Sequence, residues 1–214
     1  MAEKQTTEYV DFSGVSNLYV AKVLQNSAST YEADTPVELA GVAKVKKSVE
    51  STSEKVYYSN RTAYIINQVS DPVLEIEMSA IDNETLSYIT GIPYDKDRGA
   101  LLGGEPEPTE CALMYEYQKT NGDAVYCVYY TGSFSFPEAE NSTKADSPVH
   151  NGQTITFTSA KTQKAFTHGG RLSYTEYDVP KGDLANAKVT LTDFYTKVLT
   201  PDTVTVKPVE SQGE

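Results

Sequence analysis

The stretch that decides the fold is residues 111–136, CALMYEYQKTNGDAVYCVYYTGSFSF. Apolar and aromatic residues lie on both sides of Asn121-Gly122, a pair typical of the two-residue turn of a β-hairpin because both residues tolerate positive φ. Such a turn would place Cys127 opposite Glu116. We therefore predict two antiparallel strands joined by a tight turn. The face expected to point inward carries Leu113, Tyr115, Tyr117, Tyr126, Val128 and Tyr130.

The chain contains two cysteines, Cys111 and Cys127, and both lie in this hairpin. The two-residue turn places them on opposite faces, because successive positions of a strand point to opposite sides. A disulfide requires the two Cβ atoms to be about 4 Å apart. We therefore predict two free thiols, as is usual in a reducing compartment.

Two other segments alternate between polar and apolar residues, which predicts strands with one buried face. In residues 72–80, PVLEIEMSA, the apolar Leu74, Ile76 and Met78 share one side. Residues 153–159, QTITFTS, alternate in the same way. We expect the apolar side of both strands to pack against the core. The opposite side carries Glu75, Glu77, Ser79, Thr154, Thr156 and Thr158.

Residues 17–24, NLYVAKVL, and residues 41–49, GVAKVKKSV, are two further predicted strands. The second of them carries three lysines within an acidic protein. Lysines repeated along a strand are typical of a solvent-exposed face or of ion pairs with a neighbouring strand. We expect Glu75 and Glu77 to supply the opposite charges.

Residues 81–91, IDNETLSYITG, predict a short helix. Asp82 can accept hydrogen bonds from the backbone N–H groups of the first turn, and Gly91 can adopt the left-handed conformation that ends a helix. A second short helix is predicted at residues 192–199, before Pro201. The predicted fold is mainly β, an antiparallel β-sandwich or half-barrel with one or two short flanking α-helices.

The length of 214 residues favours a single domain spanning residues 1–214. The polar residues 1–12 are expected to form an N-terminal arm, and residues 201–214 a C-terminal arm. Residues 50–71 are expected to form a long loop or a hairpin extension, in which the polar residues 50–54 are a loop.

Eighteen basic and 30 acidic residues give the chain a net charge of −12. Extensive wrapping of nucleic acid is therefore not expected, because phosphate contacts require a basic surface. No apolar segment approaches the roughly 20 residues of a membrane-spanning helix, so no membrane partner is expected. The first nine residues lack the basic and then apolar pattern of a signal peptide.

No group of residues predicts a catalytic, cofactor-binding or metal site. The two histidines, His150 and His168, have no Cys, His or carboxylate neighbours at metal-ligand spacing. Residues 95–99, DKDRG, differ from a calcium-binding loop because the glycine comes one position early and no glutamate follows at the twelfth position. We therefore expect no cofactor and no enzymatic activity. A hydrolase built from Ser, His and Asp residues far apart in the chain stays open as an alternative.

Several short stretches follow one another in a recognisable order along residues 14–160. They are GVSNLYVAK (14–22), LAGV (39–42), VLEIE (73–77), TG (90–91), ALMYE (112–116) with NG (121–122), SFSFP (133–137) and QTITFTS (153–159). Together these stretches resemble the major tail proteins, or tail tube proteins, of long-tailed (siphovirus-type) phages that infect Gram-positive bacteria. The resemblance weakens toward the C-terminus.

The resemblance implies a non-enzymatic structural protein of the virion, made in the cytoplasm of the host bacterium. In that family, six copies join their sheets edge to edge into a ring, and the rings stack into a hollow tube that guides genomic DNA to the host. DNA would be passing cargo without specific binding. The implied protein partners are further copies of the chain, the tape measure protein, the tail terminator and the tail-tip proteins.

The same resemblance indicates which residues could meet the channel. If one side of the strand at 72–80 packs against the core, its other side is free to line the lumen. An acidic or hydroxyl-bearing lining would let DNA slide, because tight binding requires basic contacts. Residues 50–71 and the two arms are candidates for contacts between rings. The candidates for the channel lining are Glu75, Glu77, Ser79, Thr154, Thr156 and Thr158.

An alternative from another class is a carbohydrate-binding or adhesin-like β-sandwich. It would use Tyr57, Tyr58 and Tyr64 as platforms on which sugar rings stack. The chain contains no tryptophan, the residue most expected for such stacking, which disfavours this hypothesis. Assembly distinguishes the two hypotheses, because a tube protein must polymerise and a lectin need not.

Overall fold

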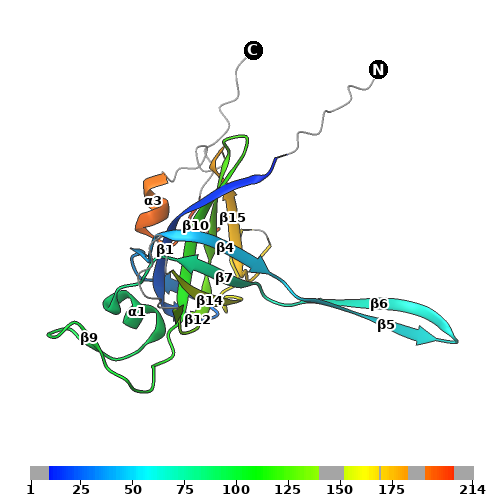
Figure 1. Cartoon of the computed structure of the whole chain (residues 1–214). Coiled ribbons are helices and arrows are strands. Elements are labelled where there is room, and N and C mark those ends of the chain that lie inside the picture. Colours follow the sequence, from blue (N-terminus) through cyan, green and yellow to red (C-terminus); the bar gives the residue numbers. More distant parts are fainter. Residues whose placement is uncertain (1–9, 140–151, 169, 183–190, 205–214) are drawn as a thin grey trace, which may run out of the picture.

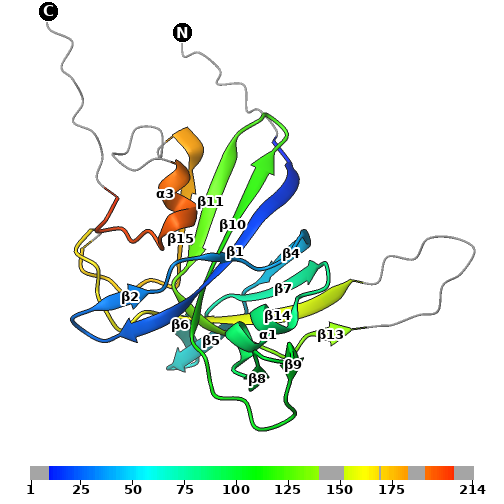
Figure 2. The ribbon, with the colours of Figure 1, turned by 90° about the vertical axis from the view of Figure 1, so that its left-hand side faces the viewer.

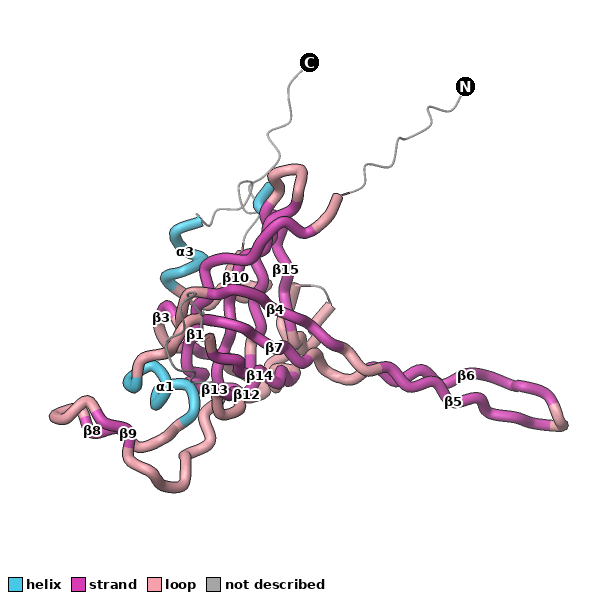
Figure 3. Tube along the Cα trace, viewed as in Figure 1, coloured by secondary structure: helices cyan, strands magenta, loops and turns pink. Residues whose placement is uncertain are grey.

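The computed structural model describes residues 10–139, 152–168, 170–182 and 191–204. Strands dominate these residues, and two short helices, α1 and α3, lie beside them (Figures 1 and 3). The strands form two antiparallel sheets that curl around a common core as a half-barrel. This architecture confirms the predicted fold class.

The first sheet contains the predicted hairpin at its centre. Its strands lie in the order β15-β11-β10-β1-β2, with β3 also paired with β1, and all its neighbouring strands are antiparallel. The strands of the first sheet are β1 (Phe12–Asn26), β2 (Tyr31–Ala33), β3 (Val37–Glu38), β10 (Cys111–Lys119), β11 (Ala124–Tyr129) and β15 (Glu176–Pro180).

The second sheet is built around the two predicted alternating strands. Its order is β12-β14-β7-β4, with β13 also paired with β14, and its neighbouring strands are antiparallel as well. The strands of the second sheet are β4 (Val42–Ser48), β7 (Val73–Met78), β12 (Thr131–Phe134), β13 (Glu138–Ala139) and β14 (Gln153–Ala160).

The apolar core between the two sheets confirms the predicted alternation. Leu74, Ile76 and Met78 of β7 are buried, and so are Ile155 and Phe157 of β14. These side chains form one cluster with apolar side chains of the first sheet. Their polar neighbours in sequence therefore point away from the first sheet.

A two-stranded hairpin projects from the body of the molecule next to the second sheet (Figure 1). It consists of β5 (Ser51–Tyr58) and β6 (Arg61–Val69), joined by Ser59 and Asn60, which both have positive φ. Most of residues 50–54, predicted to be a loop, thus belong to a strand. That prediction was wrong because pairing with β6, rather than burial against a core, holds this segment extended.

The turn of the central hairpin contains three residues, not the two predicted. The backbone N–H of Lys119 donates to the carbonyl oxygen of Asp123 (2.8 Å), so these two residues flank the loop. Gly122 has a φ of +86°, whereas Asn121 is not in the left-handed region. This is the pattern of a type I turn followed by a left-handed glycine. The predicted register was therefore wrong by one position.

The shifted register places the two cysteines on the same face of the hairpin. Cys127 is opposite Tyr115, not Glu116, and both cysteines belong to the core between the sheets. The prediction of free thiols is confirmed, but its reason was wrong. Four positions of a strand separate Cys111 from the partner of Cys127, a distance of about 13 Å that a disulfide cannot bridge.

The first sheet is buried on both faces, so the predicted inner face was wrong. Tyr126, Val128 and Tyr130 point away from the core between the sheets and form a second apolar cluster. Figure 2 shows α3 lying against this face of the sheet, where the ring of Phe194 is 4.8 Å from that of Tyr126. Residues C-terminal to β14 thus cover this second face, whereas Tyr126, Val128 and Tyr130 were expected to share the inner face with Leu113 and Tyr115.

The predicted helix at 81–91 is confirmed as α1 (Asn83–Thr90). The Asp82 side chain accepts a hydrogen bond from the backbone N–H of Thr85 (2.9 Å), and Gly91 ends the helix with a φ of +73°. A small hairpin, β8 (Tyr94–Asp95) and β9 (Ala100–Leu101), follows α1. The second predicted helix is also present, as α3 (Leu191–Thr196).

We expect Gly91→Ala to lower the free energy of unfolding by about 1–3 kcal/mol, because a side chain in the left-handed region is strained. An added Cβ would also lie 1.8 Å from the backbone oxygen of Glu107, so the loop after α1 must move. Urea unfolding followed by circular dichroism measures the effect. Gly103→Ala is the matched control, since its Cβ would have no neighbour within 4 Å. Equal stability of the two variants would contradict the described helix end.

Candidate functional site

The predicted channel-lining residues lie together on one face of the second sheet. Across β14 and β7, Thr154 is opposite Glu77 and Thr156 is opposite Glu75. Their side chains alternate with the buried side chains of both strands, so they point away from the core. The polar face, as it is called below, consists of Glu75, Glu77, Ser79, Thr154, Thr156 and Thr158 together with Lys44 and Lys46 of β4.

Two cross-strand ion pairs neutralise the charges of the polar face. Lys44 Nζ lies 2.8 Å from Glu77 Oε1, and Lys46 Nζ lies 3.4 Å from Glu75 Oε2, which confirms the predicted pairing. The hydrogen bond that Lys44 donates to Glu77, together with the negative charge of Glu77, raises the pKa of Lys44. Exposed ion pairs of this kind contribute little to stability. Their main effect here is that the two lysines match Glu75 and Glu77, so these four side chains together carry no net charge.

Both outer edges of the second sheet are unpaired within the part of the chain that the structure describes. β4 pairs only with β7, and on the other side β12 and β13 pair only with β14. An unpaired edge presents backbone N–H and C=O groups that can bind a strand of another molecule. The polar face therefore belongs to a sheet that can be extended in both directions.

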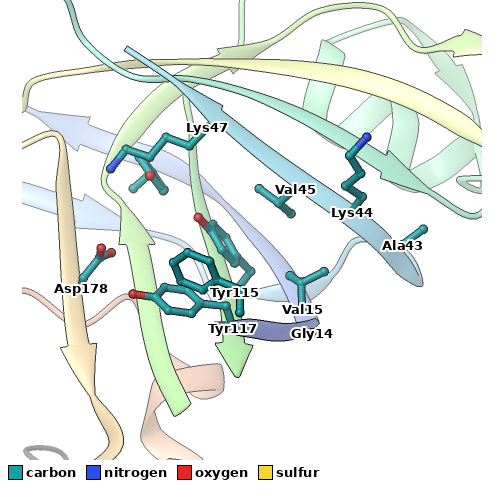
Figure 4. Close-up of a pocket in the computed structure, with 11 residues that line it drawn as sticks. Gly14, Val15, Ala43, Lys44, Val45, Lys47, Tyr115, Tyr117 and Asp178 are labelled. Carbon is teal, nitrogen blue, oxygen red and sulfur yellow. The ribbon is translucent and has the colours of Figure 1, made fainter. Parts of the chain in front are cut away.

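A cavity of about 590 Å³ opens between the two sheets at the β4 edge. β4 is the one strand of the second sheet that lines it, so the cavity lies where the second sheet stops covering the first. Figure 4 shows Val45 and Lys47 of β4 above the rings of Tyr115 and Tyr117. The apolar lining includes Phe12, Val15, Val45, Tyr115, Tyr117 and Tyr129.

An ion pair links the two sheets at one end of this cavity. Lys47 Nζ lies 2.5 Å from Glu176 Oε2 of β15, and it also lies 5.9 Å from the ring centre of Tyr129. In the register of β4, Lys47 is opposite the buried Leu74 and thus points toward the core. These contacts attach the edge strand β4 to the first sheet.

Asp178 lines the same cavity from β15. Desolvation of its carboxyl raises its pKa above the ordinary value of 3.8, although part of the residue is exposed. The positive charge of Lys47 opposes this shift without cancelling it. The carboxyl therefore holds a proton more tightly in the folded chain than in the unfolded chain.

The two thiols are chemically inactive in this environment. Burial raises the pKa of Cys111 to about 12. Burial, followed by the negative charge of Asp178, raises the pKa of Cys127 further. A thiol is nucleophilic only as the thiolate, so neither cysteine is activated for covalent chemistry at neutral pH.

The projecting hairpin exposes apolar side chains on both of its faces. Every residue of β6 is exposed, and β5 has one partly buried residue, Val56. Clustered apolar exposure is typical of an interaction surface, and an isolated two-stranded hairpin is only marginally stable in water. Strand pairing puts Tyr58, Tyr64 and Ile66 on one face and Tyr57, Ile65 and Val69 on the other.

His168 lies apart from the polar face and the cavity, whereas Phe12, from the expected N-terminal arm, lines the cavity. His168 is exposed, and its backbone N–H donates to Asp202 (2.9 Å), while His150 lies outside the described residues. Of the expected arms, residues 1–9 and 205–214 also lie outside them. Within the described ranges, no three His, Cys, Asp or Glu side chains are placed to hold a metal ion. The same ranges contain no helix that is long and apolar enough to span a membrane.

Sequence reasoning missed the cavity and the residues that link the sheets across it. The sequence contained one signal for the role of Lys47. Strict alternation in residues 41–49 puts Lys47 on the same side of the strand as Val45, which is the side that faces the core. Glu176 and Asp178 had no such signal, because no strand was predicted in that segment. Phe136, which is 55% exposed just after β12, was assigned to the hairpin without any role.

Comparison with known families places these features in context. The chain matches a family described as phage tail tube protein over residues 29–204. This match includes both sheets apart from β1, and the whole polar face. No curated protein sequence matches the chain.

We expect Asp178→Asn to gain stability relative to the native chain as the pH rises. A carboxyl whose folded pKa is raised stabilises the fold at low pH, and this contribution is lost as the pH rises from about 4 through the folded pKa. Asparagine keeps the size of the side chain but cannot ionise. Urea unfolding at several pH values between about 2 and 7, a range that also covers the titration of the control below, measures the difference between the two chains.

Asp82→Asn is the control for that series, because hydrogen bonds from Thr85 lower the pKa of Asp82. Its contribution is present above the ordinary pKa and is lost on acidification, so this variant should lose relative stability as the pH rises. The two difference curves are expected to have opposite slopes. Parallel slopes would show that the Asp178 carboxyl is not desolvated.

Proposed function

The chain belongs to the phage tail tube proteins, and we propose that six copies form a ring and that the rings stack into a tube through which genomic DNA leaves the capsid. Membership of the family makes the chain a structural subunit of the phage tail. The observation that supports the finer proposal is the second sheet, with one polar face, one buried face and two unpaired edges.

The geometry of the second sheet supports the proposed ring. Its four principal strands alternate in direction, so β4 of one copy and β12 of the next would meet antiparallel, like all other neighbours in the sheet. Pairing between two different edges is a head-to-tail contact, and repeated head-to-tail contacts produce a ring when the rotation closes. The ring would cover the backbone groups that both edges expose.

In such a ring we place the polar face on the inside, where DNA passes. Tight DNA binding comes from phosphate contacts with basic groups, and the lysines of this face are already paired with Glu75 and Glu77. The hydroxyl groups of Thr154, Thr156 and Thr158 add polarity without charge, as does Ser79. The lining would therefore be hydrated and would not bind the duplex tightly.

We assign contacts between copies to the projecting hairpin within residues 50–71. Its two apolar faces are both free to meet neighbouring subunits, in the same ring or in the next. Residues 1–12 and 201–214 are proposed as further links between rings. Tyr57, Tyr58 and Tyr64 would then bury their rings against protein rather than stack on sugar.

The remaining parts of the proposal follow from the role in the tail. The subunit would be made in the host cytoplasm and would end up in the virion. The tape measure protein would occupy the channel during assembly, and the tail terminator and tail-tip proteins would bind the two ends of the tube. We propose no catalytic step and no cofactor.

Electron microscopy of the purified chain, dilute and then concentrated, tests the proposal. We expect rings of six subunits and hollow tubes, with tail-tip components added if the chain alone stays monomeric. A variant in which Gly-Gly replaces residues 52–68 should keep its unfolding midpoint, because the hairpin contributes almost nothing to the core, but it should not form tubes. A chain that stays monomeric with tail-tip components present would refute the proposed function.

The charge of the polar face is tested by two opposite double variants. Glu75→Gln with Glu77→Gln leaves the two lysines unpaired, so the lining becomes basic and DNA ejection from phage should slow, more so at low salt. Lys44→Gln with Lys46→Gln breaks the same ion pairs but leaves the lining acidic, so ejection should stay near the native rate. Dye-detected ejection kinetics measure both. If the two variants slow ejection equally, the polar face does not line the channel.

A further inference from the structure

We infer that the aromatic ring of Phe136 from one copy enters the cavity at the β4 edge of the next copy and packs there. This inference rests on the proposed edge-to-edge ring and identifies the side chains that join its subunits. It commits to one occupant of the cavity, a second copy of this chain.

The cavity is placed to receive a group from outside. β4 is the one strand of the second sheet among its lining, and β4 is an unpaired edge within the described chain. Its floor is formed by the aromatic side chains of Tyr115 and Tyr117, as Figure 4 shows. An apolar, aromatic cavity of this kind is filled most favourably by another aromatic ring.

The opposite edge of the second sheet, at β12, carries an aromatic side chain, Phe136, that is only partly buried. Phe134, the last residue of β12, packs its ring 4.9 Å from that of Phe157 in the core. The ladder continues one residue further, where Ser135 N donates to the carbonyl oxygen of Thr156 (2.8 Å). Alternation then puts Phe136 on the same side of the strand as Phe134, but its side chain is 55% exposed.

Pairing of β4 of one copy with β12 of the next would bring the cavity and Phe136 together. The core side of β4 carries Ala43, Val45 and Lys47, all of which line the cavity. The core side of β12 and its extension carries Phe134 and Phe136. Side chains on the same side of two paired strands are neighbours, so joining the edges places Phe136 beside the cavity mouth.

Charge on the other side of the same two edges favours this pairing. The polar side of β4 carries Lys44 and Lys46. At the opposite edge, the ladder with β14 shifts by one residue between Ser135 and Glu138, so Glu138 of β13 is paired with Thr154 and lies on the polar side as well. Two lysines of one copy would meet a glutamate of the next, whereas pairing of β4 with β4 would bring lysines together. Head-to-tail pairing is thus preferred over symmetric pairing.

Photocross-linking from position 136 tests the inference. Phe136 is replaced by p-benzoylphenylalanine, which keeps an aromatic ring, and the chain is assembled together with ¹⁵N-labelled native chain. After irradiation we expect cross-linked peptides that combine one unlabelled and one labelled partner, with the labelled partner drawn from residues 12–15, 43–47 or 115–117. Leu172, which is equally exposed at 55% and lies outside both sheets, is the control position.

Truncation provides the second measurement. Removing an aromatic anchor from an interface commonly weakens association by about tenfold or more, so Phe136→Ala should raise the concentration needed for assembly by at least that factor. Leu172→Ala should leave it nearly unchanged. Both side chains are largely exposed, so circular dichroism should show both variants folded.

The outcomes separate this inference from the proposed function. In one outcome, rings form while the cross-links are confined to the same copy or to other surfaces of the neighbour. That result would overturn the role of Phe136 but would not contradict the proposed ring. Equal assembly of the two alanine variants would do the same. Failure of the native chain to form rings would overturn the proposed function, and this inference with it.

Discussion

The strand β7 (Val73–Met78) and its register with both neighbours determine the rest of the structure. Because side chains alternate strictly, a slip of one position would expose Leu74, Ile76 and Met78 and would bury Glu75 and Glu77. Burying two carboxylates without partners costs far more than the apolar contacts supply. The lysines of β4 oppose the same slip from the solvent side. One register therefore fixes the core and the polar face together.

The second sheet is narrower than the first. This difference in width explains which apolar side chains at the two edges stay exposed. Among the described residues, none of the second sheet covers the first sheet beyond β4, so the cavity over Tyr115 and Tyr117 is open and Lys47 reaches across it to Glu176. Beyond β12, the same residues leave Phe136 55% exposed. A monomer with two such edges gains stability by contact with a copy of itself, which is what a tail tube subunit requires.

The parts of the fold that sequence predicted are those in which local pattern and tertiary contacts agree. The helix at 81–91 has its own capping residues, and the strand at 72–80 has a strict alternation. The central hairpin was misregistered because the same Asn121-Gly122 pair fits a two-residue and a three-residue turn, and local hydrogen bonds select the latter. The second apolar cluster was missed because its cover comes from α3, about 65 residues further along the chain.

The distribution of charge makes the polar face suitable for passing DNA. The net charge of −12 resides elsewhere, as in residues 82–110, where seven acidic residues face two basic ones. On the polar face, opposite charges lie within 4 Å of each other, so their fields would largely cancel at the distance of a duplex in the proposed channel. A strongly acidic wall would raise the energy of DNA inside the tube, and a basic wall would hold it. Paired charges avoid both of these effects.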